Sequence, residues 1–326
     1  DLKILFQKKV RKAFLFQTLL FKFDNLFYTY FKTMGEVKDL SQYHQLLSAF
    51  FKQPQSIQEW DQYKLTAAQV EFFNENGYLS GIKMLEEWQV DELCKQLAEI
   101  ADPNHPGHHL FYEFHTNEST DPDAVLFHSL GHWRITEGFH DLFWNPAFTR
   151  AASQLLGDVS VRLWHDQLFC KPAHHGGVVA WHQDYSYWTC TRPMQHLTCW
   201  VALDDATTEN GCLNYIPGSH RWGLLDRPNL AGDMNGLMEF LNDEQKAAFK
   251  PIPIELKKGY ATFHHPLLVH GSHENKSERS RRAFVLNAFA DGTMSDIDDD
   301  FLDGIPFVKK GKKMEGQFFP LLYVLH

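Results

Sequence analysis

The stretch WHQDYSYW, residues 181–188, places a histidine and an aspartate two positions apart. If this stretch is a strand, successive side chains point to opposite faces, so His182 and Asp184 project from the same face. Two interpretations compete: a hydrogen-bonded pair on the surface, or two of the three protein ligands of a metal ion. A lone pair of this kind is weak evidence for a metal, so the decision rests on a third ligand.

Candidates for the third ligand lie in residues 263–289, FHHPLLVHGSHENKSERSRRAFVLNAF. On a strand, His264 and His270 would share one face, so either histidine is a candidate partner for the first pair. Two histidines and one carboxylate form a facial triad that leaves three adjacent positions open on octahedral iron(II), which suits chemistry with molecular oxygen. Rolled sheets bring strands that are distant in sequence together at the mouth of a barrel.

Arg281 follows in the same stretch and precedes an apolar run. A guanidinium that pairs with both oxygens of a carboxylate neutralises its charge and fixes its orientation. This arrangement suits a small dicarboxylate, and the co-substrate that it implies is 2-oxoglutarate, which would chelate iron through its keto acid. Arg282 stays open as the alternative anchor, because a shift of one residue in register exchanges the two faces of a strand.

The composition limits the class of protein. The 326-residue chain is 44% hydrophobic, 14% aromatic and 22% charged, which fits a globular enzyme and is too apolar for a disordered chain. Its formal net charge of −10 disfavours nucleic acid and anionic membranes as partners. No stretch approaches the roughly 18 uninterrupted apolar residues of a membrane span. We therefore expect a soluble protein that acts on a small-molecule substrate, with its oligomeric state left open.

The cysteines indicate a compartment. There are five, an odd number, and none forms a CxxC pair. Most lie in apolar runs where a thiol behaves as a small hydrophobic side chain. This pattern argues against a zinc ribbon and favours a reducing, cytoplasmic location.

The chain begins with a segment of different composition. Residues 1–33 are basic, rich in phenylalanine, and contain neither glycine nor proline. One interpretation is a targeting or membrane-surface segment. We favour the other, in which Met34 is the natural start and residues 1–33 are not native to the protein. Residues 34–64 are predicted as an N-terminal helical or linker segment, and residues 65–326 as one domain.

Helical signals come first along that domain. Thr66 with Gln69 three residues later forms a capping box, and Gly77 is a terminator, so a short helix is expected between them. Apolar residues at helical spacing predict a second helix over residues 86–101. The stretch NPAFTRAASQLLGD predicts a third helix that ends at Gly157.

After the third helix the pattern changes to short β-branched or aromatic runs of strand length. Because no helices intervene between most of them, these runs indicate an antiparallel sandwich or barrel. We predict a mainly β fold, a jelly roll, with flanking α-helices that come first in the chain. The predicted strands fall within residues 159–172, 195–206, 211–220, 259–272 and 281–291.

Residues 223–250 interrupt the strands with a long helix-and-loop insertion. Insertions of this length in a compact domain are commonly lids or binding loops. A reactive site of the kind described above needs to exclude water and protect the protein, so we expect this segment to close over it.

Several of these stretches resemble the motif blocks of the phytanoyl-CoA dioxygenase family of iron(II)- and 2-oxoglutarate-dependent oxygenases. They are WHQDYSYW, CWVALDDATTENGCLNYIPGSH and FHHPLLVHGSHENKSERSRRA, and FFNENGYL is similar to an N-terminal helix of that family. The resemblance covers approximately residues 65–290. It implies the fold of the family, a double-stranded β-helix of the cupin-like jelly-roll type, which agrees with the strand prediction.

Carried over position by position, the resemblance implies roles for seven residues. It favours His270 over His264 as the third iron ligand and Arg281 over Arg282 as the anchor of 2-oxoglutarate. Gln167 stands where the family uses another residue type, so its role is the least secure. The implied iron ligands are His182, Asp184 and His270, and the implied co-substrate contacts are Arg281, Ser272, Trp200 and Gln167.

The aromatic residues beside the first pair suit the mouth of a substrate pocket, because they combine an apolar ring with a polar tip. Packing between the sheet and a lid is the alternative for each of them. Four further histidines are expected to lie around the metal site or on the surface, since a facial triad leaves no room for extra ligands. The aromatic residues are Trp181, Tyr185, Tyr187 and Trp188, and the histidines are His174, His175, His264 and His265.

The resemblance implies an iron(II)- and 2-oxoglutarate-dependent dioxygenase that uses O2 and releases succinate and carbon dioxide. We expect it to hydroxylate an aliphatic carbon of a small or lipid-like organic substrate. Related halogenases replace the carboxylate ligand with a small residue, and the presence of Asp184 favours hydroxylation instead. Two alternatives stay open: a non-catalytic module that binds 2-oxoglutarate or metal, and a zinc hydrolase on a similar barrel.

Overall fold

The computed structural model of the protein describes residues 37–119, 121, 123–174, 176–231 and 233–325. The predictions for residues 1–33, Met34 and His175 fall outside these ranges. Among the helices of the described residues, none is both long and apolar enough to cross a membrane.

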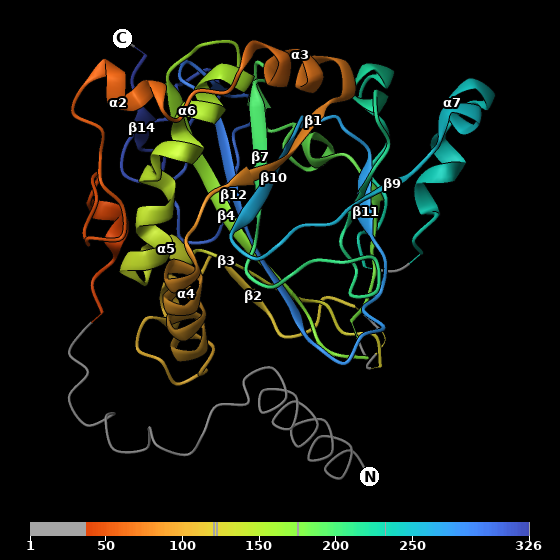
Figure 1. Cartoon of the computed structure of the whole chain (residues 1–326), viewed down its shortest axis with the longest axis horizontal. Helices are drawn as coiled ribbons and strands as arrows, with labels where there is room; N and C mark the ends of the chain where they lie inside the picture. The colour runs from red at the N-terminus through yellow and green to blue at the C-terminus, as the bar shows by residue number, and fades with distance from the viewer. Residues whose placement is uncertain (1–36, 120, 122, 175, 232, 326) are drawn as a thin grey trace.

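A large antiparallel sheet forms the centre of the molecule (Figure 1). Its strand order is β1-β10-β7-β12-β4-β3-β2, and β14 pairs with β4 outside this path. Apart from the consecutive strands β2, β3 and β4, neighbouring strands are not consecutive in the sequence, so the sheet depends on long-range pairing. The bounds are β1 Tyr78–Lys83, β2 Glu113–His115, β3 Phe127–Leu130, β4 Val161–Lys171, β7 His196–Ala202, β10 Tyr260–His264, β12 Arg281–Ala290 and β14 Leu321–Tyr323.

A second antiparallel sheet has the order β5-β11-β8-β9, and a separate pair is formed by β6 and β13. In Figure 1, β9 and β11 lie to one side of the large sheet and α4, α5 and α6 to the other. The two sheets together form the predicted jelly roll, so the predicted fold class is confirmed. The bounds are β5 Val179–His182, β6 Thr191–Arg192, β8 Leu213–Tyr215, β9 Ile252–Ile254, β11 His270–Ser272 and β13 Met294–Ser295.

Helices cover the face of the large sheet that turns away from the second sheet. Phe139 of α5 lies 4.6 Å from Phe284 of β12 between ring centroids, and Phe148 of α6 lies 6.4 Å from Phe263 of β10. All four rings are fully buried, so the main apolar core lies between helices and sheet. The α-helices are α2 Ile57–Asp61, α3 Ala67–Asn76, α4 Glu87–Ile100, α5 Glu137–Asp141, α6 Pro146–Leu155 and α7 Asp243–Ala248.

Short 3-10 helices connect many of these elements, as tight turns at helix ends and between strands often do. The described ones are η2 Leu40–Gln42, η3 His108–Leu110, η4 His132–Arg134, η5 Leu142–Trp144, η6 Asp184–Tyr187, η7 Ser219–Trp222 and η8 Gly236–Phe240.

The helices predicted from capping and periodicity are present. Thr66 and Gln69 form both bonds of the capping box at the start of α3, and Gly77 ends it with φ +81°, a left-handed conformation that glycine adopts without strain. In α4 the predicted apolar stripe is buried, with Val90, Leu93, Cys94, Leu97 and Ile100 facing the core.

Alternation along the strands separates two faces of the large sheet. On β12, Phe284 and Leu286 belong to the core beneath the helices, whereas Val285 faces the second sheet together with Arg281. The space between the two sheets therefore receives every second side chain of β4, β7 and β12.

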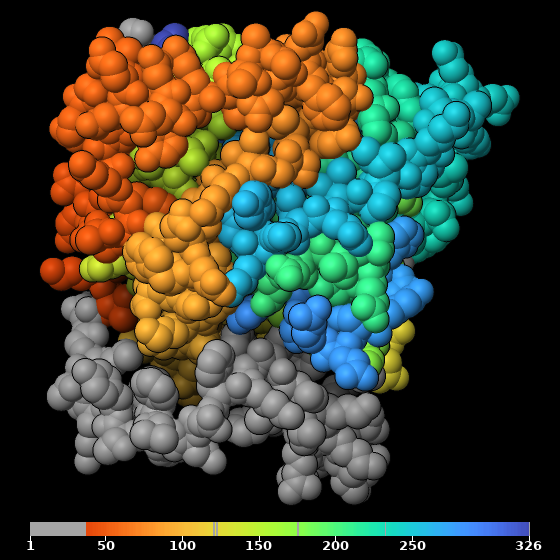
Figure 2. Space-filling model, viewed as in Figure 1, coloured from red at the N-terminus to blue at the C-terminus, as the bar shows by residue number. Residues whose placement is uncertain are grey.

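The described part of the N-terminal segment packs onto the helical side of the molecule. Asp39 pairs with Arg134 of η4 through two guanidinium nitrogens, and Asp141 of α5 accepts hydrogen bonds from the backbone N–H groups of Leu47 and Ser48, each at 2.9 Å. Figure 2 shows this segment, coloured red to orange, as a continuous layer over one side. The predicted boundary between residues 34–64 and the main domain stays a prediction.

Two strand predictions were wrong in detail. The first strand ends at His182, and Asp184 opens the 3-10 helix η6. The intervening Gln183 remains extended, with φ −117° and ψ 132°, so the alternation still carries both side chains to one side. In the other stretch, β10 ends at His264 and β11 begins at His270 in the second sheet, so the two histidines do not share one strand.

The described part of segment 223–250 packs over β5. The N–H of Ala180 donates to the carbonyl of Leu230 at 2.9 Å, and the N–H of Trp181 to that of Met234 at 3.3 Å. Leu237 and Leu241 of this segment join a small apolar cluster with Trp181. The role of the segment as a lid stays a prediction.

Candidate active site

Three side chains converge between the two sheets. His182, Asp184 and His270 each offer one ligand atom, and these atoms all lie within 4.8 Å of one another. Asp184 Oδ1 lies 3.4 Å from His182 Nε2 and 3.5 Å from His270 Nε2. Two imidazole nitrogens and a carboxylate oxygen at one point form the donor set of a facial triad.

Strand pairing fixes the spacing of the two histidines. His182 of β5 and His270 of β11 are directly opposite each other in the antiparallel ladder. Their ring centroids lie 4.1 Å apart, as side chains that project from directly paired positions on one face can do. The second sheet itself, rather than a loop, therefore positions two of the three ligands.

The backbone sets the tautomer of both histidines. His182 Nδ1 lies 2.8 Å from the carbonyl oxygen of Ala180, and His270 Nδ1 lies 2.9 Å from that of Leu268. A carbonyl only accepts, so each Nδ1 carries the proton and each Nε2 presents a lone pair toward Asp184. This is the arrangement that metal-binding histidines adopt, so the residues fit a divalent metal ion.

Asp184 is held by its second oxygen. Oδ2 accepts from the Thr198 hydroxyl at 2.6 Å and lies 2.9 Å from His264 Nε2. Burial raises the pKa of this carboxyl, but the neighbouring imidazoles of His270, His182 and His264 lower it further, so it stays well below its ordinary range. The carboxylate is thus ionised and oriented for a cation.

His264 therefore holds the carboxylate ligand instead of acting as a ligand. Its other nitrogen, Nδ1, lies 2.9 Å from the hydroxyl of Tyr215 in β8. The sequence interpretation placed His264 around the metal site, which this geometry supports, but contained no signal for Thr198 or Tyr215. His174 and His265 do not line the cavity; His265 packs against His220.

Arg281 lies at the inner end of the same cavity and is only 1% exposed. Its Nη2 donates to the carbonyl of Gly211 at 2.9 Å and lies 3.3 Å from the Ser272 hydroxyl, while its Nε has no partner. Burial lowers its pKa to about 10. A buried guanidinium with an unused N–H and no carboxylate beside it fits the far carboxylate of 2-oxoglutarate.

The neighbouring arginine points the other way. Arg282 pairs with Asp204 through Nε at 2.8 Å and Nη2 at 2.7 Å, on the opposite face of β12. The Arg281 guanidinium instead lies 5.4 Å from the ring centre of Trp200, which lines the cavity as expected. Of the two arginines left open by the strand register, Arg281 is thus the one inside.

A buried lysine that the sequence interpretation missed stands behind Ser272. Lys171 pairs directly with Arg281 across β4 and β12. Its Nζ donates to the Ser272 hydroxyl, to the Ser272 carbonyl at 3.1 Å and to the His273 carbonyl at 2.5 Å. Burial, and next the nearby Arg281, lowers its pKa well below the ordinary value. The inner end therefore holds two basic side chains, Arg281 and Lys171, with no carboxylate in an ion pair with either of them among the described residues.

The cavity has a volume of about 320 Å3. Tyr187 and Trp188 line it, as expected of substrate contacts. Trp181 and Tyr185 do not line it: Trp181 packs against Phe249 beneath segment 223–250, and the Tyr185 hydroxyl donates to a backbone carbonyl at 2.6 Å. Packing between sheet and lid, the alternative interpretation, describes Trp181 better.

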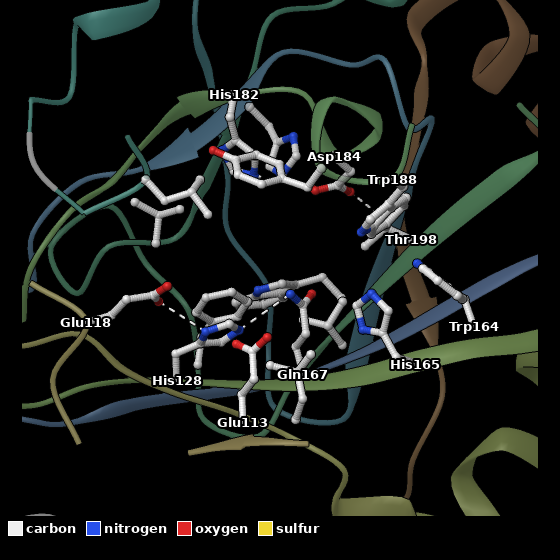
Figure 3. Close-up of a pocket in the computed structure, with 18 of the residues that line it drawn as sticks. Glu113, Glu118, His128, Trp164, His165, Gln167, His182, Asp184, Trp188 and Thr198 are labelled. Carbon is white, nitrogen blue, oxygen red and sulfur yellow. Dashed lines mark hydrogen bonds and ion pairs between the residues drawn. The ribbon is translucent and has the colours of Figure 1, made fainter. Parts of the chain in front are cut away.

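Gln167 lies on the floor of the cavity in a chain of polar contacts (Figure 3). Its Oε1 accepts from Asn287 Nδ2 at 3.2 Å, and its Nε2 lies 3.4 Å from His128 Nε2. The other nitrogen of His128 lies 3.0 Å from Glu118 Oε2. His128 carried no signal in the sequence because β3 is too short for an alternating pattern, and Glu118 lies in the connection between β2 and β3.

A jelly roll that gathers two histidines and a carboxylate beside a buried arginine defines a class of protein, the non-heme iron, 2-oxoglutarate-dependent oxygenases. The sequence model of the phytanoyl-CoA dioxygenase family matches residues 73–283. The chain belongs to that family, as its motifs predicted, and is a 2-oxoglutarate-dependent dioxygenase that uses iron, 2-oxoglutarate and oxygen.

Individual relatives agree with this assignment. Phytanoyl-CoA dioxygenase from Arabidopsis thaliana is 29% identical over 256 residues, covering 68% of this chain and 88% of the relative. Methylphosphonate hydroxylase from Gimesia maris is 28% identical over 237 residues, covering 71% and 84%. The crystal structure of a non-heme α-ketoglutarate-dependent carbocyclase from nogalamycin biosynthesis has the same fold, with a TM-score of 0.66 at 21% identity over 80% of this chain and 97% of that one.

Proposed function

We propose that the protein hydroxylates an aliphatic carbon of a small or lipid-like organic molecule. His182, Asp184 and His270 would hold iron(II), and Arg281 with Ser272 would bind the far carboxylate of 2-oxoglutarate. The single observation that carries the proposal is the convergence of three ligand atoms in one cavity with a buried, partly unpaired guanidinium. Iron bound there supplies oxygen activation coupled to the decarboxylation of 2-oxoglutarate to succinate.

The residues of the chain would do the positioning. The Nε2 lone pairs of His182 and His270 face the metal because their Nδ1 protons are held by carbonyls, and His264 orients Asp184. Trp200 forms a wall of the co-substrate pocket beside Arg281. Gln167 is proposed as a contact near the co-substrate through its place on the cavity floor.

The carboxylate ligand favours hydroxylation over halogenation, because Asp184 would hold the metal where a halide would otherwise bind. The names of the relatives, phytanoyl-CoA dioxygenase and methylphosphonate hydroxylase, describe very different substrates, so membership of the family does not choose one. Substrate contacts through Tyr187 and Trp188 are supported by their place in the cavity wall.

We also propose that residues 65–326 form the catalytic unit and that segment 223–250 acts as its lid. The hydrogen bonds of this segment to β5 and its Leu230 in the cavity wall support the second point. A cytoplasmic location is proposed on the cysteines: all five are free thiols, and four of them are buried.

Anaerobic titration of iron(II) and then 2-oxoglutarate into metal-free protein tests the proposal. The expected result is a weak visible charge-transfer band that is absent in His182→Ala and weakened in Arg281→Gln. Release of succinate on exposure to oxygen would separate an enzyme from a non-catalytic module. Tight zinc binding without any band in the native protein would instead favour the zinc hydrolase.

A further inference from the structure

Glu113, Glu118 and His128 line the cavity opposite the metal ligands, and Trp164, Tyr187 and Trp188 also line it; we call these six residues the outer half. Figure 3 shows Glu113, Glu118 and His128 across the cavity from His182 and Asp184, with Trp164 to one side. We infer that this outer half binds a small organic cation, a substrate with a protonated amine or quaternary ammonium group and a hydrogen-bond acceptor at its other end. The inference rests on the proposed function and adds the substrate class.

Charge is unevenly distributed along the cavity. In the loaded inner half, the charges of iron(II) and Arg281 balance those of Asp184 and of the two carboxylates of 2-oxoglutarate. Among the described residues that line the cavity, the outer half contains two carboxylates, one of them beside His128, and neither lysine nor arginine. A positively charged ligand would balance the excess of carboxylates there.

The two carboxylates differ in their exposure to solvent and in the histidine beside them. Glu118 is 28% exposed, and its Oε2 lies beside His128. Burial raises the pKa of Glu118, but the contact with His128 lowers it further, so the carboxyl stays ionised at neutral pH. Glu113 is 42% exposed and lies 3.3 Å from His115. Both carboxylates therefore retain capacity for a ligand that enters from solvent.

Trp164 provides an independent sign of a ligand. Its side chain is only 3% exposed, yet its indole Nε1 is buried without a hydrogen-bond partner. Figure 3 shows this nitrogen turned toward the cavity, and Trp164 lines it. Buried donors are rarely left unpaired, so a ligand with an acceptor at this position would satisfy the indole N–H.

A β-bulge explains why Trp164 reaches the cavity. Consecutive residues Asn287 and Ala288 of β12 pair with His165 and Leu163 of β4, so Trp164 is one extra residue in β4. An extra residue re-aims the side chains of a strand, and here it brings Trp164 to the cavity beside His165. Bulges of this kind are common next to functional sites.

Size and aromatic rings favour a small cation over an acyl-CoA. The whole cavity holds about 320 Å3, part of which 2-oxoglutarate would fill. The phosphates of coenzyme A need cationic partners, and the six residues of the outer half include neither lysine nor arginine; Arg227, which does not line the cavity, lies 5.2 Å from the ring centre of Tyr187. The rings of Tyr187 and Trp188 offer faces on which an ammonium group is stabilised.

Three probes of nearly the same shape test the inference: choline, its neutral analogue 3,3-dimethylbutan-1-ol, and the anion 3,3-dimethylbutanoate. Each is titrated calorimetrically into the whole protein loaded anaerobically with iron(II) and 2-oxoglutarate, and the charge-transfer band is recorded in the same samples. We expect choline to bind at least about fivefold more tightly than either analogue.

Conservative substitutions identify the residues that give the preference for choline. Glu118→Gln and Glu113→Gln should each reduce the preference for choline about threefold to tenfold. Trp164→Phe, which keeps an aromatic ring but removes the indole N–H, should lower the affinity for choline. None of the three should change the band or the affinity for 2-oxoglutarate. Glu209→Gln, which removes an exposed carboxylate that does not line the cavity, serves as the matched control and should change nothing.

The outcomes are distinct. A choline preference that disappears in the Glu118 variant supports the inference. A normal band with no preference for choline, or with a preference that survives both glutamate substitutions, overturns the inference and leaves the proposed function intact. Absence of the band in the native protein overturns the proposed function, and the inference with it.

Discussion

The inner and outer halves of the cavity are built differently. The inner half lies between regular strands, and most of its polar atoms have partners: Asp184 Oδ2 has two and Lys171 Nζ has three. Its one unpaired donor, among those described above, is Arg281 Nε. The outer half is formed by short strands, a 3-10 helix and a bulge, and it leaves the Trp164 N–H unpaired. The unpaired donor of the inner half suits a co-substrate that does not change, whereas that of the outer half suits recognition of a particular ligand.

The largest expected effect is a loss of affinity for iron(II). His182→Ala removes one of three ligand atoms, so iron affinity should fall roughly 100-fold or more, judged against the smaller effects of outer contacts. Anaerobic equilibrium dialysis with iron(II) measures this directly. The matched control is His265→Ala, a histidine outside the cavity, and equal losses in both variants would show that the metal does not depend on this triad.

The next effect concerns the co-substrate. Arg281→Gln removes a desolvated charge, so 2-oxoglutarate affinity should fall about 100-fold. Arg282→Gln breaks the pair with Asp204 on the other face and should leave that affinity unchanged. Titration of 2-oxoglutarate into the iron-loaded variants gives both values. A larger loss in the Arg282 variant would contradict the assignment of the faces of β12.

A smaller effect is expected at the residue that orients the carboxylate ligand. His264→Gln shortens the reach to Asp184 Oδ2, and iron affinity should fall about 10-fold to 100-fold, as for other groups that orient metal ligands. Tyr215→Phe removes only the next contact and should cost less. If His264→Gln matched the native protein, Thr198 alone would suffice to hold the carboxylate.

The smallest expected effects are on the free energy of unfolding, and they compare one buried side chain from each half of the cavity. Lys171→Met removes three hydrogen bonds to oxygen acceptors in the inner half, so the free energy of unfolding should fall by about 1–3 kcal/mol. Trp164→Phe breaks no hydrogen bond, so the free energy of unfolding should fall only through the lost ring volume, by no more than about 1–3 kcal/mol. Urea unfolding of both variants measures these changes, and a fall of more than about 4 kcal/mol in the Trp164 variant would contradict an unpaired N–H.

The difference between regular and irregular elements also explains what the sequence could predict. Three features that depend on neighbouring residues agree with the structure: the capping box at Thr66, the apolar stripe of α4, and the proximity of His182 and Asp184. The choice of Arg281 over Arg282 followed the family spacing, and the side-chain placement agrees with it.

The outer half was missed for physical reasons. Glu113 and His128 belong to strands of three and four residues, too short for periodicity to show. The orientation of Trp164 depends on a bulge, which no local pattern reveals. Trp181 was assigned to the substrate from its place beside His182, but the alternation of β5 turns it to the far face, toward segment 223–250.

Strand β5 joins two parts of the molecule that would otherwise act independently. Its last residue, His182, is a candidate metal ligand, and its Ala180 and Trp181 N–H groups hold segment 223–250. If a metal ion that fixes His182 also stabilises that segment, linkage makes the effect reciprocal: whatever stabilises the segment tightens metal binding by the same factor. Strand β5 thus connects the candidate metal site directly to segment 223–250.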